Sequence, residues 1–410
     1  MTTVRILAAA GATAFAFLAF AGAREPVPEN VPELLVTTAG RKVAAAADWE
    51  KLRRPELLRI FETEVYGTRP VERPADLRFE TVVENPEALG GTAVMKRVKI
   101  SFSGAYGARE FVVTAFFPKS ATPAPVFLYA GIQGDAPGLN SHRHAGDGQV
   151  SAKFLDERWP VQKILARGYA TAAFQVTQLA DDDYDAFKAG VYPVFQRAED
   201  RTAESWGALS AWAWGASRVM DWLETEKLAD ARRVAVVGLS RGGKTALWAG
   251  ATDTRFAMAC SSGSGCCGAK LNHIELQPVN DEHIARILRF RHWFCRNFDR
   301  YSGKDLTMPF DQHEMIALIA PRLVCIASAT DDDGAGPLGE YYGALLASPA
   351  WELYGKKGLV ANAFPPPETP LQEGSVSYHV RRGGHDLMAY DWNRFMDFAD
   401  KHGWRAGAGK

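Results

Sequence analysis

The sequence predicts an α/β fold in which a mainly parallel sheet lies between two layers of helices, a three-layer sandwich. Short and almost entirely apolar runs, such as 125–130 and 323–328, are typical of strands that are buried on both faces. Helical patterns alternate with these runs, which is the order that parallel strands require. A valine-rich run, 234–237, stops at Gly238 and is followed by helix formers, which predicts a tight strand–turn–helix unit.

The first half of the chain supplies one edge of this sheet. Apolar residues at helical spacing over 48–66 predict one helix, with Pro55 as the point where it would break. The alternating, β-branched stretches 79–83, 97–102 and 111–117 predict antiparallel strands ahead of the parallel ones.

The remaining elements alternate along the chain. After the strand at 125–130, the patterns predict a helix at 159–167, a strand at 169–174, a polar, Asp-rich excursion at 175–203, a helix at 205–227, and strands at 256–261, 323–328 and 376–380. We expect the excursion to run over the rim of the functional site. Residues 268–313 are interpreted as a partly helical insertion in a single domain over 24–410.

The amino terminus has the pattern of a secretory signal peptide. Arg5 precedes the apolar stretch 6–20, and the Ala-Gly-Ala that ends at Ala23 has the small residues of a cleavage site. An uncleaved membrane anchor is the alternative, but the stretch is short, and Pro26 and Pro28 follow at once. We therefore expect an exported protein, cleaved near Ala23, with no stable membrane insertion.

Composition and charge exclude some classes of partner. The 410 residues are 47% hydrophobic and 23% charged, with a formal net charge of −1, which is ordinary for a globular protein. Because no basic block stands out, we expect no nucleic-acid partner. The five cysteines are an odd number, and the adjacent pair at 266–267 lacks the spacing of a zinc site, so we expect no metal and no other cofactor.

The strand–turn–helix unit carries the pattern of a nucleophile. Ser240 lies between Gly238 and Gly242 as G-x-S-x-G, the nucleophile elbow of an α/β-hydrolase. A serine on such a turn has a strained backbone, and the glycines let strand and helix pass close to it. Its hydroxyl then lies at a helix amino terminus, where amides and the helix dipole favour a developing oxyanion. An ordinary strand–helix turn is the alternative.

A serine nucleophile needs a base, which follows the serine and the acid in the chain order of this fold. His385, in a glycine-rich turn after the last strand, is the candidate. Other histidines fit less well: His142 and His144 on an earlier loop, His379 inside a strand, and His292, His313 and His402 on helices or the surface.

The acid is expected in the loop after the strand at 323–328. This loop offers Asp331, Asp332 and Asp333 at the position that commonly carries the acid. One of them fits, and the other two are then solvated loop charges, so the pattern alone leaves the choice open.

Several of these stretches together strongly resemble the glucuronoyl esterases of carbohydrate esterase family 15, in particular its bacterial branch. They are 238–250, 292–298 and Gly384-His385-Asp386, and the resemblance runs from about Trp159 to Trp392. Its most specific part is Ser-Arg-x-Gly-Lys, which stands here at 240–244. The resemblance implies an α/β-hydrolase that cleaves esters between 4-O-methyl-glucuronic acid on xylan and lignin alcohols.

The charged residues of this motif have expected roles. Arg241 keeps its charge and can donate to a tetrahedral oxyanion. Lys244 lies one helical turn after Ser240 and is expected to reach sugar hydroxyls. By the resemblance, Glu282 falls where the family has a Gln or Glu that contacts the sugar. Pairing of Arg241 and Lys244 with surface carboxylates is the alternative.

Departures from the family pattern at two positions concern the acid and the sugar pocket. Many members carry the acid as Glu after the strand that corresponds to 256–261, where this chain has Gly263. Some bacterial relatives use an Asp after the following strand, and comparison with their Asp-x-Trp-x-Asp-Pro pattern selects Asp332. The same comparison puts Gly334 in the place of a substrate-contacting Trp, so we expect one wall of the sugar pocket to be missing.

The sequence therefore predicts an exported, monomeric serine esterase. Its site residues are Ser240, His385 and Asp332 as the triad, Arg241 at the oxyanion, and Lys244 and Glu282 at the sugar. The expected substrate is a glucuronoxylan–lignin ester or a small glucuronate ester. Two alternatives remain: an acetyl xylan esterase with the same triad, and a carbohydrate-binding protein that has lost catalysis.

Overall fold

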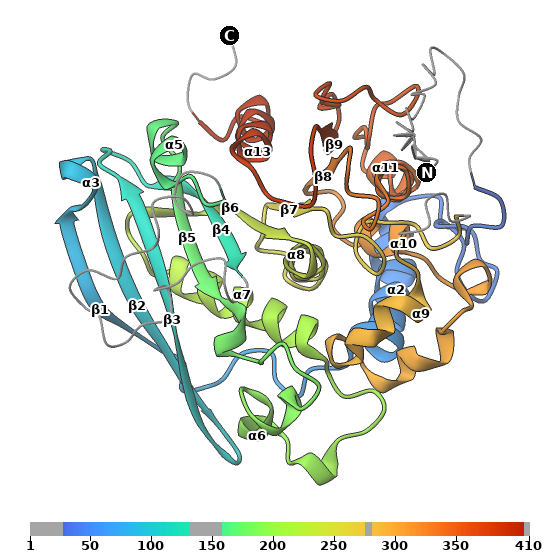
Figure 1. Ribbon diagram of the computed structural model, residues 1–410, viewed down its shortest axis with the longest axis horizontal. Helices are drawn as coiled ribbons and strands as arrows, with labels where there is room; N and C mark the ends of the chain where they lie inside the picture. The colour runs from blue at the N-terminus through green and yellow to red at the C-terminus, as the bar shows by residue number, and fades with distance from the viewer. Residues whose placement is uncertain (1–27, 132–157, 275–280, 406–410) are drawn as a thin grey trace, which may run out of the picture.

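The computed structural model describes residues 28–131, 158–274 and 281–405 (Figure 1). The predicted signal peptide, His142 and His144 lie outside these residues. Within the described ranges, every helix is too short or too polar to cross a membrane.

A nine-stranded sheet forms the centre of the molecule, in the order β1-β2-β3-β5-β4-β6-β7-β8-β9. The pairings from β1 to β5 are antiparallel, and those from β5 through β4 to β9 are parallel. This confirms the α/β-hydrolase fold with antiparallel strands at its amino-terminal edge. The strands are β1 (Arg78–Glu87), β2 (Ala93–Gly104), β3 (Gly107–Pro118), β4 (Ala124–Gly131), β5 (Ala170–Gln175), β6 (Ala229–Leu239), β7 (Met258–Ser262), β8 (Leu323–Ala329) and β9 (Val376–Arg381).

Alternation along the central strands sends side chains into two separate cores. In β4, Val126 and Leu128 join one core, Phe127 and Tyr129 join the other, and none is more than 1% exposed. Helices cover both faces (Figure 1): α7 (Ala208–Leu223) and α8 (Arg241–Thr252) on the first, α5 (Val161–Ala166) and α13 (Ala389–Lys401) on the second. A strand between two cores must be apolar at every position, which is why these strands were recognisable in the sequence.

The amino-terminal helix is continuous from Ala46 to Tyr66 and changes type along its length. Its parts are α1 (Ala46–Asp48), η1 (Trp49–Arg53), α2 (Arg54–Phe61) and η2 (Glu62–Tyr66), of which η1 and η2 are π-helical. The break predicted at Pro55 is a change from π to α geometry at this point, because proline has no amide to continue the hydrogen-bond pattern.

Two segments between the sheet elements supply most of the remaining helices. The excursion after β5 contains η3 (Val176–Gln178), η4 (Ala186–Lys188), α6 (Tyr192–Phe195) and η5 (Ala198–Asp200). The region between β7 and β8 contains α9 (Ile284–Ile287), η6 (Leu288–Trp293), η7 (Arg296–Tyr301), η8 (Asp305–Thr307) and α10 (Gln312–Ala317). Elsewhere the structure has α3 (Ala88–Gly91), α11 (Pro337–Ala347) and α12 (Pro349–Glu352). All five cysteines are buried free thiols.

Candidate active site

The turn between β6 and α8 presents Ser240 at the carboxyl end of a central strand. Ser240 has φ 59° and ψ −124°, a strained conformation for a residue with a side chain, and its N–H donates to the Ser262 carbonyl at 2.8 Å. A Cβ atom on Gly238 would lie 1.9 Å from the Gly242 carbonyl oxygen. The strand and the helix can therefore cross this closely only because Gly238 has no side chain, as expected for an elbow.

His385 and Asp332 meet in the cavity that also contains Ser240. His385 follows β9 and Asp332 follows β8, and their Nδ1 and Oδ2 atoms are 2.7 Å apart. Asp332 is buried, with 7% exposed, whereas Asp331 and Asp333 are exposed. Of the three aspartates in this loop, Asp332, which the family pattern selects, is the one in contact with the histidine.

The Asp332 carboxylate changes the proton affinity of His385. The hydrogen bond that His385 donates to Asp332, together with the charge of this carboxylate, raises the pKa of His385 above its usual 6.5, although burial acts in the opposite direction. The imidazolium form is thus stabilised, which is what a base needs while it holds a proton taken from a nucleophile.

Gly263 lies against this pair. Its φ is +50°, and a Cβ atom there would be 2.9 Å from Asp332 Oδ2 and 3.3 Å from His385 Nδ1. A side chain at this position would therefore require Asp332 or His385 to move from its observed place. Many family members have a glutamate where this chain has Gly263. Here the Asp332 carboxylate, from the loop after β8, lies where that side chain would begin.

A cavity of about 240 Å³ joins these residues. It is lined by Ser240, Arg241, Gly263, Glu282, Arg289, Phe290, Trp293, Asp332, Gly334, Ala335 and His385. The lining thus contains every site residue predicted from the sequence except Lys244. Gly334 lies in the wall, where the resemblance leads one to expect a tryptophan.

Lys244 does not line the cavity but is buried next to Glu282, which does. Its side chain is 2% exposed, and its ammonium donates to the Ser264 carbonyl. Its Nζ atom is 3.9 Å from Oε2 of Glu282 and 5.8 Å from the centre of the Trp293 ring. Lys244 therefore supports the loop after β7 and the Glu282 carboxylate in this conformation.

Asp182 holds Arg241 in place. One Asp182 oxygen accepts from the Arg241 guanidinium, and the other accepts from His292 Nε2 at 2.8 Å and Trp293 Nε1 at 2.6 Å. Burial raises the pKa of Asp182, but these hydrogen bonds and the Arg241 charge outweigh it and lower the pKa. Arg241 is thus paired, with a half-buried carboxylate at the rim of the site. The His292 side chain, expected on a helix or the surface, lies in η6 and is only 5% exposed.

Known proteins with the same architecture decide the family. Carbohydrate esterase MZ0003, from an unknown prokaryotic organism, is 36% identical over 91% of this chain and 89% of its own. The glucuronoyl esterase from Solibacter usitatus is 40% identical, with a TM-score of 0.81 over 90% of this chain and 97% of that one. This chain belongs to the glucuronoyl esterases of carbohydrate esterase family 15. A fungal glucuronyl esterase model matches residues 156–355.

This glucuronoyl esterase is accordingly a carboxylic ester hydrolase. It is also similar to a promiscuous esterase of the same family from the marine bacterial metagenome, at 34% identity and a TM-score of 0.80 over 92% of this chain and 98% of the other. The family resemblance seen in the sequence is confirmed.

Sequence reasoning missed two residues that hold parts of this candidate site in place. Asp182 belongs to the Asp-rich excursion that was expected at the rim of the site. The sequence did not indicate that this residue binds Arg241. Glu340 gave no signal: it is fully buried on α11 and accepts hydrogen bonds from the Ser264 and Ser328 hydroxyls and the Gly265 amide, and burial raises its pKa to about 7. It ties the loop after β7 to β8 and α11.

Proposed function

We propose that this glucuronoyl esterase hydrolyses 4-O-methyl-glucuronoyl esters that link glucuronoxylan to lignin, through an acyl-enzyme on Ser240. The observation that carries the proposal is the 2.7 Å contact between His385 and Asp332 in the same cavity as the strained Ser240. A serine, a buried carboxylate and a histidine in this chain order, with the last two in contact in the cavity that contains the serine, form the constellation of serine esterases.

The proposed reaction has two steps. The Ser240 oxygen attacks the ester carbonyl, and His385 takes the serine proton at Nε2 while Asp332 holds Nδ1. The tetrahedral intermediate collapses, and His385 gives the proton to the departing alcohol. A water molecule, deprotonated by His385, then attacks the acyl-enzyme and releases the uronic acid and free Ser240.

The charges around the cavity suit a uronate ester. The first amides of α8 and the Arg241 guanidinium are proposed to stabilise the oxyanion. Glu282 and Arg289 line the same cavity and are proposed to bind sugar hydroxyls, with Lys244 holding the Glu282 carboxylate from behind.

Acetyl xylan esterase activity is a second candidate with the same triad. Gly334, a residue without a side chain in the cavity wall where the family pattern has a tryptophan, and the promiscuous marine relative favour it. Comparing kcat/KM for benzyl D-glucuronate with that for an acetylated xylooligomer separates the two. We expect the glucuronate to be preferred, and a preference for the acetyl ester would overturn the proposed substrate. The alternative of a binding protein that has lost catalysis arose because Gly263 replaces the acid of many family members. We do not propose it, because Asp332 contacts His385 and can serve as the acid instead.

We also propose export with cleavage near Ala23, and a monomeric state. The signal-peptide pattern of the sequence supports the export. The mass of the protein recovered from the exporting host and its size in solution test both points.

A methyl group added at Gly263 should impair catalysis. In Gly263→Ala, the new Cβ meets Asp332 Oδ2 at 2.9 Å, so the carboxylate must move away from His385, and we expect kcat to fall by about 10- to 100-fold. Gly303→Ala is the matched control, because Gly303 also has a positive φ (+70°) but open space around its Cβ position. Equal activity of the two variants would contradict the steric account.

The pH profile should report the raised pKa of His385. The base acts only when neutral, so kcat/KM should fall as the pH drops through a midpoint above 6.5. Removing the Asp332 charge in Asp332→Asn lowers this pKa and should move the acid limb to lower pH in the residual activity, whereas Asp333→Asn should not move it. An acid limb below pH 6.5 in the unmodified enzyme would contradict the assignment.

A further inference from the structure

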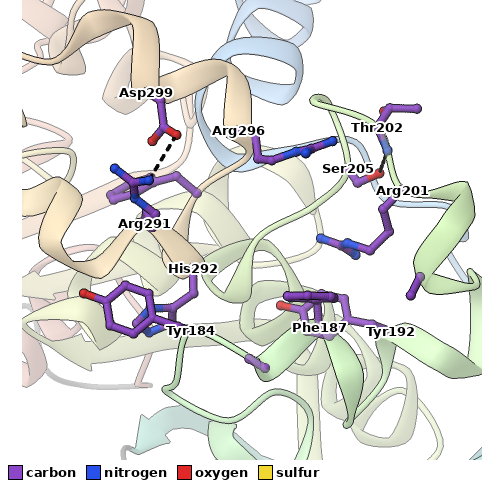
Figure 2. A pocket seen from close by; sticks show the side chains of 13 residues that line it. Tyr184, Phe187, Tyr192, Arg201, Thr202, Ser205, Arg291, His292, Arg296 and Asp299 are labelled. Atoms are coloured by element: carbon purple, nitrogen blue, oxygen red, sulfur yellow. Dashed lines mark hydrogen bonds and ion pairs between the residues drawn. The ribbon is translucent and has the colours of Figure 1, made fainter.

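A second and larger cavity, of about 440 Å³, lies between the excursion after β5 and the segment η6–η7 (Figure 2). Its walls include Tyr184, Phe187, Tyr192, Arg201, His292 and Arg296, and we call it the arginine cavity. Its lining residues and those of the Ser240 cavity are different sets, so the triad does not account for its composition.

Two arginines face this cavity without a carboxylate partner in the described ranges. Arg201 donates from Nη2 to the Trp206 carbonyl at 2.8 Å, and its Nη1 atom is buried with no hydrogen-bond partner among the described residues. Burial lowers the pKa of Arg201, and the neighbouring Arg296 charge lowers it further. A buried donor beside a second cation is an unfavourable arrangement that a bound anion would relieve.

A third arginine of the wall, Arg291, is already paired. Its Nη1 atom lies 3.8 Å from Asp299, and both side chains are substantially exposed. The cavity therefore keeps an excess of positive charge at Arg201 and Arg296.

The other walls are mainly aromatic. The Arg201 guanidinium lies 4.9 Å from the centre of the Tyr192 ring and 5.6 Å from that of Phe187, and Figure 2 shows it extending over these rings. Tyr184 is 55% exposed and packs edge-on against His292 at 5.2 Å. The Ser205 hydroxyl already accepts from the Thr202 amide at 2.9 Å. The cavity thus offers aromatic rings that can pack against a flat apolar ligand, and fewer free hydrogen-bonding groups that could bind the hydroxyls of a sugar.

The arginine cavity and the Ser240 cavity lie on either side of the pair His292–Trp293. His292 lines the first and Trp293 the second, and both donate to Asp182, which holds Arg241. A ligand in the arginine cavity is therefore separate from an acyl group on Ser240.

We propose that the arginine cavity binds an aromatic carboxylate, with the carboxylate between Arg201 and Arg296 and the ring against Tyr184. Two guanidinium groups supply charge-assisted hydrogen bonds to the carboxylate, and the exposed tyrosine supplies a stacking face. This site does not depend on the proposed catalytic roles, since no step of the reaction uses it.

Titration calorimetry with 4-hydroxy-3-methoxycinnamate tests the proposal on the full protein. Arg296 is exposed, so Arg296→Gln should fold normally, and we expect it to weaken binding by about tenfold or more. Arg197→Gln is the matched control, because Arg197 is an exposed arginine nearby that does not line the cavity. It should bind like the unmodified protein, as should Ser240→Ala.

Two further ligands and one further variant sharpen the test. The corresponding neutral alcohol should bind at least tenfold more weakly, and so should D-glucuronate in the part of its binding that Arg296→Gln removes. Tyr184→Ala should weaken binding of the aromatic acid. Equal binding of acid and neutral alcohol would overturn the carboxylate assignment. Binding of D-glucuronate that is tighter than that of the aromatic acid and is weakened by Arg296→Gln would overturn the aromatic one. No binding, or binding unaffected by Arg296→Gln, would overturn the site itself.

Discussion

Replacing Ser240 with alanine is expected to lower kcat for benzyl D-glucuronate by about 10⁴-fold or more. The hydroxyl is the proposed nucleophile, presented on the strained turn between β6 and α8, and the substitution removes it. Because alanine occupies no more space than serine, the structure of the turn should persist. Steady-state kinetics and a melting curve on the same preparation measure both effects.

Ser262→Ala is the control for this variant. Ser262 is a neighbouring serine whose hydroxyl donates to the Asp386 carbonyl at a long distance, 3.5 Å. Its own carbonyl, which accepts from the Ser240 amide, is retained in the alanine variant. We expect Ser262→Ala to keep most of the activity. Activity of Ser240→Ala within tenfold of the unmodified enzyme would exclude Ser240 as the nucleophile.

Asp332→Asn is expected to lower kcat by about 10³-fold or more, the second large effect. An amide at this position no longer fixes the His385 tautomer or stabilises the imidazolium that forms when the serine is deprotonated. The side chain has almost the same size, so a loss of turnover cannot be attributed to packing. Kinetics on benzyl D-glucuronate should show the change in kcat more than in KM.

The chain offers two matched controls for this substitution. Asp331→Asn and Asp333→Asn remove the same charge within one residue of Asp332, but both side chains are exposed. We expect each to retain activity within about threefold, because exposed charges contribute little. A comparable loss in either one would show that the loop charge as a whole, rather than the contact with His385, supports catalysis.

Most of the sheet could be predicted from the sequence because its central strands lie between two cores. Each position of β4 must then be apolar, and such a run stands out. The Ser240 turn was equally visible, since the crossing at Gly238 permits no side chain there. His385 followed from the chain order of the fold.

The acid and the cations were harder because their roles depend on the direction of side chains. Three consecutive aspartates look alike in a sequence, and only tertiary packing buries Asp332 against His385. Lys244 has the right helical spacing from Ser240, yet its ammonium donates to the Ser264 carbonyl behind the wall. Asp182 holds Arg241 from a loop about sixty residues earlier, a contact that no local pattern encodes.

The rate at which a fluorophosphonate labels Ser240, measured with and without benzyl D-glucuronate, tests the central claim most directly. The account predicts one labelled peptide, the one that contains Ser240, and labelling that slows as the ester approaches saturation, because both compete for the same nucleophile. Labelling of a different residue, or labelling of Ser240 at an undiminished rate while the ester is being hydrolysed, would contradict it.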